Sequence, residues 1–222
     1  DVIKDINTKR MELITATVME SSPRGTTFSF KSGREQIDLF LKPEESVPGE
    51  ILYPGDRRKI LIIGADRTDR GIRITITRAA EQFVAKLFEQ AVPEIKNGKI
   101  IVKGIVREPG IRTKLAVEST DPSIDPVGSC IGPNRARVEA VRQELGEEKI
   151  DIIPFSQDSS EYIAKALAPA KVISVEPDPE NAKKYNVRVK EDQFSLAIGA
   201  KGVNVALAAK LTGYKIDIMK AE

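Results

Sequence analysis

Alternating apolar and polar residues fill the first third of the chain, and this period of two predicts β-strands. Clusters of Gly, Pro, Ser and Asp separate the runs, and the longest connection covers 42–55, between the third and fourth runs. Five short strands in this arrangement predict a small barrel of the OB type. The expected strands are Leu13–Met19, Thr26–Lys31, Gln36–Leu41, Arg57–Ala65 and Gly71–Arg78.

Helical periodicity replaces the strand pattern after Arg78. Apolar residues recur at three- and four-residue intervals from Phe83 to Ala91, and Pro93 ends this predicted helix. Two β-rich runs then flank a Pro-Gly turn and predict a hairpin, which two helices and a strand follow. The resulting order is α-β-β-α-α-β, with further elements at Ile100–Val106, Ile111–Glu118, Asp125–Ile131, Arg135–Leu145 and Lys149–Pro154.

The same order of elements then appears a second time. Ile131-Gly132 returns as Ile198-Gly199, 67 residues later, and Lys149–Ile152 returns as Lys215–Ile218, 66 residues later. A repeat with this period indicates duplicated α/β modules in tandem. The expected elements of the second copy are Ser159–Ala168, Lys171–Glu176, Tyr185–Val189, Phe194–Ile198, Val203–Leu211 and Tyr214–Met219.

A Gly-x-x-Gly turn joins the two central helices of the second copy. Because glycine has no side chain to hold a ligand off, such a turn can lie flat against a phosphodiester backbone. Its amides and the following helix N-terminus face phosphate oxygens, and Lys201 adds a positive charge. In this order of elements the turn is typical of a type II KH domain, which clamps about four nucleotides of single-stranded nucleic acid. We therefore expect RNA contacts from Ile198, Gly199, Ala200, Lys201, Gly202, Val203 and Asn204.

Composition narrows the classes of function. The net charge of +2 does not indicate bulk attraction to nucleic acid, so any basic surface must be local. The absence of histidine and the single Cys130 argue against a histidine-based active site, a disulfide framework and a cysteine metal site. We expect Cys130 to be a buried small hydrophobe, and Asp151 and Asp217 to be structural. No catalytic residue, metal or cofactor is expected, and no apolar run reaches the length needed to cross a bilayer.

Several stretches resemble the RNA-binding core of the NusA family of bacterial transcription factors, in which an S1-type OB domain precedes two type II KH domains. The resemblance implies a cytoplasmic elongation factor that modulates RNA polymerase pausing, termination and antitermination while it holds nascent single-stranded RNA. It implies that an N-terminal domain absent here makes the main polymerase contact, and it places Gln193 and Ser195 near RNA. The resembling stretches are Arg107–Lys114, Asp125–Gly132, Ala166–Ala170, Leu196–Gly199 and Ala208–Ile218.

The resemblance also implies a division of the chain into domains. Residues 1–9 would be the remnant of a connector helix and 10–78 the S1 domain. The first KH domain would cover 79–154 and the second 155–222. We expect a monomer, since nothing in the sequence indicates obligate assembly.

The first KH loop departs from the family pattern, because it reads Gly132-Pro133-Asn134-Arg135. Arginine in place of the second glycine disfavours a positive φ, at a cost of about 1–2 kcal/mol where that conformation is required. The same arginine offers a guanidinium to phosphate. The alternative is that this loop has lost contact with RNA. We hypothesise that the first KH domain holds RNA less through Gly132, Pro133 and Asn134 and more through Arg135, Arg137, Arg112 and Lys114.

The barrel leaves two questions open. Phe28, Phe30 and Phe40 can fill the barrel or stack on bases, as aromatic residues do on OB-fold strands. The stretch Arg57–Arg78 carries seven Arg or Lys residues against two Asp, and it predicts either a solvated edge or a basic face. We expect Ser159 and Ser160 to cap the helix that they begin.

Two other functions compete with RNA binding by a transcription factor. S1 and KH domains also accompany exoribonucleases, although there the KH domain precedes the S1 domain. The second alternative is a protein-interaction scaffold with vestigial RNA grooves, whose basic S1 face meets acidic proteins.

Overall fold

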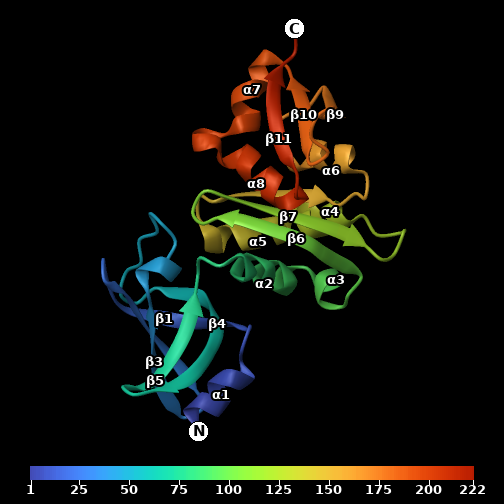
Figure 1. The fold of residues 1–222 in the computed structure, drawn as a ribbon. Helices are drawn as coiled ribbons and strands as arrows, with labels where there is room; N and C mark the ends of the chain where they lie inside the picture. Colours follow the sequence, from blue (N-terminus) through green and yellow to red (C-terminus); the bar gives the residue numbers. More distant parts are fainter. The chain divides into compact units, whose positions relative to one another are not determined.

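The computed structural model describes residues 1–222 and divides them into two compact units (Figure 1). One unit contains 1–87 together with 143–146, and the other contains 88–142 and 147–222. Each unit has its own sheets and its own buried core.

The first unit is a nearly closed antiparallel barrel. Its strand order is β3-β2-β1-β4-β5, and β3 lies next to β5. Register shifts at Val18/Glu20 and Ile62/Gly64 add the local twist that bends β1 and β4 around the barrel. All five predicted strands are confirmed. Their bounds are β1 (Leu13–Ser22), β2 (Gly25–Ser32), β3 (Glu35–Leu41), β4 (Arg57–Thr68) and β5 (Gly71–Thr77).

A short helix packs against the barrel. Helix α1 (Val2–Thr8) begins at Asp1, whose carboxylate accepts a hydrogen bond from the amide of Ile3. It contributes Ile6, which is fully buried in the barrel core with Phe28 and Ile60. A 3₁₀ turn, η1 (Pro43–Glu45), opens the long connection between β3 and β4.

The first KH domain contains the predicted hairpin, helix pair and final strand. In its sheet, β6 (Ile100–Glu108) pairs antiparallel with β7 (Arg112–Ser119), and β7 pairs parallel with β8 (Lys149–Pro154). The sequence did not predict α3 (Pro93–Lys96), a single turn that starts at the proline expected to end the preceding helix. The other elements are α2 (Glu81–Ala91), α4 (Pro126–Ile131), η2 (Pro133–Arg135) and α5 (Ala136–Leu145).

The second KH domain repeats this topology. Strand β10 (Lys184–Val189) pairs antiparallel with β9 (Ser174–Pro177) and parallel with β11 (Lys215–Lys220). The tandem repeat predicted from the sequence is therefore confirmed. The expectation that Ser159 and Ser160 cap the first helix is wrong, because Asp158 accepts the amide hydrogen bonds of Ser160 and Glu161. The helices are α6 (Ser159–Ala166), α7 (Glu191–Ile198), η3 (Ala200–Gly202) and α8 (Val203–Thr212).

The two KH domains share one hydrophobic core within the second unit. Ala116 on β7 and Ile153 on β8 are buried in the same cluster as Leu167 and Ala208 of the second domain. Gly104 on β6 faces Leu211 on α8, and a Cβ at Gly104 would lie 3.1 Å from Leu211 Cδ1. The two KH domains are therefore packed together along the sheet of the first (Figure 1).

Candidate nucleic-acid interface

The two KH loops have nearly the same backbone. Gly132 has φ 78° and ψ 169°, and Gly199 has φ 79° and ψ 165°. Two residues later, Asn134 (φ 52°, ψ 29°) and Lys201 (φ 55°, ψ 24°) are both left-handed. These loops therefore present their backbones alike although three of their four residues differ.

Arg135 takes the conformation that its residue type disfavours. Its φ is 62°, beside 73° for Gly202 at the equivalent position. The positive φ is therefore required at this position, which is the condition on which the expected cost depends. The strain of about 1–2 kcal/mol anticipated for a non-glycine residue therefore applies here. The first KH loop keeps its shape at a cost in stability.

The two loops differ in what they offer to a phosphate. Ala200 has an amide N–H, whereas Pro133 at the equivalent position has none. The first loop instead carries Arg135, whose side chain is 60% exposed and lies 3.9 Å from Glu139. An exposed pair at this distance is weak, so the guanidinium is available to another anion. The second loop thus offers more backbone donors, and the first offers a guanidinium.

Two cations expected at RNA are instead held inside the protein. The Lys114 side chain is fully buried, and its Nζ donates to Asp151 Oδ2 at 2.8 Å and to the carbonyl of Ala168 at 2.7 Å. Burial lowers the pKa of Lys114, although Asp151 opposes the shift. Arg112 is 11% exposed and donates to both oxygens of Asp151. Lys114 therefore links the two KH domains, Arg112 is held within the first, and the structure corrects the expectation that they face RNA.

Two further expected contacts lie behind the loops. Asn204 is 2% exposed, so its side chain is not presented to solvent. Arg137 is partly buried and forms an ion pair with Glu94 at 2.7 Å. Glu94 on α3 was not anticipated as part of the site. For Arg137 the sequence did contain a signal, because the 67-residue repeat places it at the position equivalent to Asn204.

The remaining predicted residues of the second KH domain lie around its loop. Lys201 and Gly202 lie within the turn; Lys201 is exposed, and no atom lies within 4 Å of a Cβ built at Gly202. Ser195 is exposed, whereas Gln193 accepts a hydrogen bond from the amide of Lys171. Ile198 ends α7 and Val203 begins α8, and both are half-buried on either side of the loop.

The barrel aromatics separate into core and surface. Phe28 is fully buried, and Phe30 packs against the barrel core. Phe40 is 49% exposed and lines a hollow of about 360 Å³ with Lys42 and Arg73. Only Phe40 of the three therefore presents a substantial ring surface to a base.

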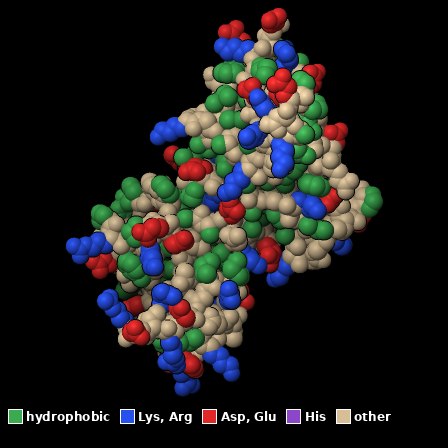
Figure 2. Space-filling model, in the orientation of Figure 1, with side chains coloured by type: hydrophobic (Ala, Val, Ile, Leu, Met, Phe, Trp, Pro, Cys, Tyr) green, Lys and Arg blue, Asp and Glu red, His purple; other side chains and the backbone are tan.

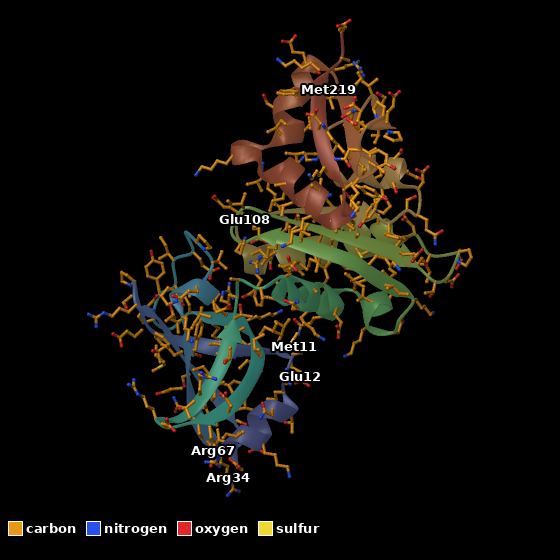
Figure 3. All side chains as sticks on the ribbon, viewed as in Figure 1. Met11, Glu12, Arg34, Arg67, Glu108 and Met219 are labelled. Carbon is orange, nitrogen blue, oxygen red and sulfur yellow. The ribbon has the colours of Figure 1, made fainter.

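The basic stretch of the barrel is largely paired. Arg78 is buried and donates to both carboxylate oxygens of Glu50, while Arg73 pairs with Asp66 at 2.6 Å. Arg67 at the end of β4 and Arg34 in the β2–β3 turn lie at the same end of the barrel (Figure 3). Arg67 pairs with Asp1 at 3.3 Å. On the face in Figure 2, cations are interspersed with carboxylates, which favours local contacts over one broad basic field.

Other candidate chemistry lies outside the loops. Cys130 is buried, and desolvation, followed by the charge of Glu94, raises its pKa to about 12. Such a thiol is not a nucleophile at neutral pH, as expected. No group of three His, Cys, Asp or Glu side chains is arranged to hold a metal. No single helix is long and apolar enough to cross a membrane; α7 and 200–212 pass that test only as a pair bent by 49°.

The fold and the loops define an S1–KH–KH protein, with an OB-type barrel followed by two type II KH domains. Residues 78–155 match the family of NusA-like first KH domains, and residues 159–222 match that of NusA-like second KH domains. The chain belongs to the NusA family.

Relatives support this assignment along the whole chain. The chain is 43% identical to the transcription termination/antitermination protein NusA of Thermus thermophilus, over 100% of this chain and 56% of the relative. The protein of the same name from Bacillus subtilis is 45% identical over 82% of this chain and 49% of its own length. The chain therefore spans about half the length of the curated relatives it matches. A solved structure, the crystal structure of APE1850, aligns with a TM-score of 0.46 and 23% identity over 63% of this chain and 97% of its own.

Proposed function

We propose that this chain binds single-stranded RNA and belongs to a bacterial factor that acts in transcription termination and antitermination. The observation that carries the proposal is the pair of loops with matching backbones, held in one unit by a common core. A rigid pair of sites binds an extended strand more tightly than one site, because the second contact is intramolecular. The names of the relatives support the role in transcription.

The RNA-contacting residues that we propose are fewer than the sequence predicted. In the second KH domain they are the loop Gly199–Gly202 with the flanking Ile198, Val203 and Ser195. In the first they are Gly132, Asn134 and Arg135, and Phe40 is the stacking candidate of the barrel. The domain bounds that we propose are 10–78, 79–154 and 155–222, with α1 of residues 1–9 packed against the barrel.

Further proposals concern the full-length factor. Nascent RNA is the nucleic-acid partner, and RNA polymerase is the protein partner of the full-length factor, mainly through a domain outside this chain. We propose a monomeric, cytoplasmic, non-enzymatic factor whose modulation of pausing, termination and antitermination follows from its hold on RNA.

Fluorescence anisotropy with a labelled single-stranded RNA decamer, over a series of salt concentrations, tests this function. We expect saturable binding whose salt slope, about 0.7 per neutralised phosphate, indicates only a few charge contacts. A double-stranded RNA of the same length should bind more weakly, because the bases cannot enter an apolar groove. Equal, steeply salt-dependent binding of both RNAs supports the scaffold alternative, and cleavage of the decamer supports the exoribonuclease alternative.

A further inference from the structure

A polar side chain stands behind each KH loop, five residues after the loop's first glycine; it is buried in the second domain and partly buried in the first. In the second domain this residue is Asn204, and in the first it is Arg137. A Cβ built at Gly199 would lie 2.8 Å from both the backbone nitrogen and the Cβ of Asn204. A Cβ built at Gly132 would lie 2.6 Å from Cγ of Arg137. The first glycine of each loop therefore packs directly on this residue.

Asn204 ties three segments of its domain together. Its Nδ2 donates to the carbonyl of Ala197, near the end of α7, at 2.9 Å. The same nitrogen donates to the carbonyl of Leu167, just after α6, at 3.1 Å. Since Asn204 itself lies in the first turn of α8, the amide holds both helices that flank the loop. These bonds restrict how the loop can move.

Arg137 forms the corresponding tie with different chemistry. Its Nη1 donates to the carbonyl of Ser129, near the end of α4, at 2.8 Å. It also donates to Oε2 of Glu94 on α3 at 2.7 Å. The loop helices are thus joined to each other and to the helical segment before the sheet, as in the second domain. Two unlike residues hold two loops in one conformation.

Asn204 carries an unfavourable feature that packing alone does not explain. Its Oδ1 is buried and has no hydrogen-bond partner. A buried acceptor without a partner destabilises a fold, and an apolar side chain of similar size avoids that penalty. Such an apolar side chain would, however, lack the N–H donors that bond to the carbonyls of Leu167 and Ala197.

We propose that Asn204 and Arg137 are positioning residues for RNA binding. Each holds its loop in the phosphate-facing conformation by two hydrogen bonds, and neither needs to touch RNA. This inference rests on the proposed RNA contact of the loops. It moves Arg137 and Asn204 from RNA ligands to supports of the residues that bind RNA.

The test compares Asn204→Ala with Ile218→Val in the 222-residue chain. Ile218 is buried on β11 in the core cluster that the two KH domains share and makes none of the loop hydrogen bonds, so its variant supplies a control for lost stability. Amide hydrogen exchange at Gly199 and Gly202, whose amides donate to the carbonyls of Ser195 and Gly199, reports the loop, and anisotropy with an RNA decamer reports affinity. We expect Asn204→Ala to speed loop exchange about tenfold and to weaken RNA binding three- to tenfold. We expect Ile218→Val to leave both unchanged.

Two outcomes separate the inference from the proposed function. Unaltered loop exchange in Asn204→Ala would overturn the positioning role. Faster loop exchange with unaltered affinity would overturn the RNA contact of this loop. Asn204→Asp has the same shape without the amide donors, so its loop must exchange as fast as that of Asn204→Ala; protection at the wild-type level would overturn the role of the donors.

Glu94→Gln is a second variant that leaves the loop sequence and the charge of Arg137 intact. If Arg137 positions the first loop, loss of its carboxylate partner should speed exchange at Gly132 and Arg135, whose amides are hydrogen-bonded, and lower RNA affinity. If Arg137 instead binds phosphate itself, its release from Glu94 should raise affinity, which would overturn the inference for the first domain.

Discussion

The two KH domains use one backbone for two kinds of loop. The second loop combines glycines with a free amide at Ala200, whereas the first has proline at that position and a strained arginine after it. Equivalent positions elsewhere differ in the same way, with Arg137 opposite Asn204 and a buried Asp151 opposite a half-exposed Asp217. The comparison shows that a duplicated fold conserves the path of its chain more closely than the chemistry along it.

The largest difference that we predict concerns Asp151 and Asp217. Asp151→Asn should lower the free energy of unfolding of the second unit by about 3 kcal/mol, because it leaves the buried Lys114 without its carboxylate. Asp217 is 48% exposed and lies 3.8 Å from Lys184, so Asp217→Asn should cost less than about 0.5 kcal/mol. Urea unfolding followed by circular dichroism measures both. Equal losses would show that the equivalent carboxylates are energetically alike.

The second prediction concerns the open position of the second loop. Gly202→Asp should weaken binding of a single-stranded RNA by at least tenfold, because it sets a carboxylate beside the phosphate site. Space around Gly202 is open, and Asp tolerates the left-handed backbone better than most residues. Gly202→Asn has the same shape without the charge and is the matched control. Equal affinities of the two variants in an anisotropy titration would contradict the phosphate contact.

Substitution of Gly199 is a less clean experiment than substitution of Gly202. The double change Gly199→Asp with Gly202→Asp would not report on charge alone. Any side chain at Gly199 meets the backbone of Asn204, so that change disturbs the helix pair as well. Substitution of Gly202 alone changes the charge beside the phosphate site without disturbing the packing.

The third prediction concerns Arg135 in the first loop. Arg135→Gly should raise the free energy of unfolding by about 1 kcal/mol, since glycine adopts the positive φ without strain. If the guanidinium binds phosphate, the same change should reduce the salt slope of RNA binding by about 0.7. Arg135→Asn, which tolerates this backbone but lacks the charge, should show the same change in salt slope. An unchanged slope in both variants would remove Arg135 from the interface.

The smallest prediction concerns Cys130, whose equivalent in the second domain is Ala197. Because its folded pKa is raised to about 12, the buried thiol stabilises the fold below the unfolded pKa of about 8.5. That contribution is lost as the pH rises through 12. Cys130→Ala should therefore lose less stability than wild type between pH 9 and 11, by chemical denaturation. Identical pH profiles would contradict this account.

The fold was predictable because periodicity reports local structure well. The five barrel strands and both α-β-β-α-α-β modules follow from it, and the 67-residue repeat located both loops. The interior was less predictable. Lys114 alternates with apolar residues on a strand, and its position along the chain does not reveal that the second KH domain covers it. Arg78 resembles one more surface cation, yet it is buried against Glu50.

The loop conformations show the same limit at a finer scale. Residue preferences indicate that arginine resists a positive φ, but Arg135 adopts one in the loop between α4 and α5. Asn204 follows a glycine loop in sequence and was therefore expected at the ligand. Its amide instead turns inward to the carbonyls of Leu167 and Ala197. Tertiary contacts decide which polar residues of a loop remain free.

The common core of the KH domains has a consequence for synthesis on the ribosome. The sheet of the first domain is complete once β8 has emerged, but Ala116 and Ile153 then still face water. Lys114 lacks its acceptor at Ala168 until a further helix has been made. These groups of the first domain are therefore covered only after the second domain has been synthesised. Until then the exposed sheet face can bind chaperones or misassemble.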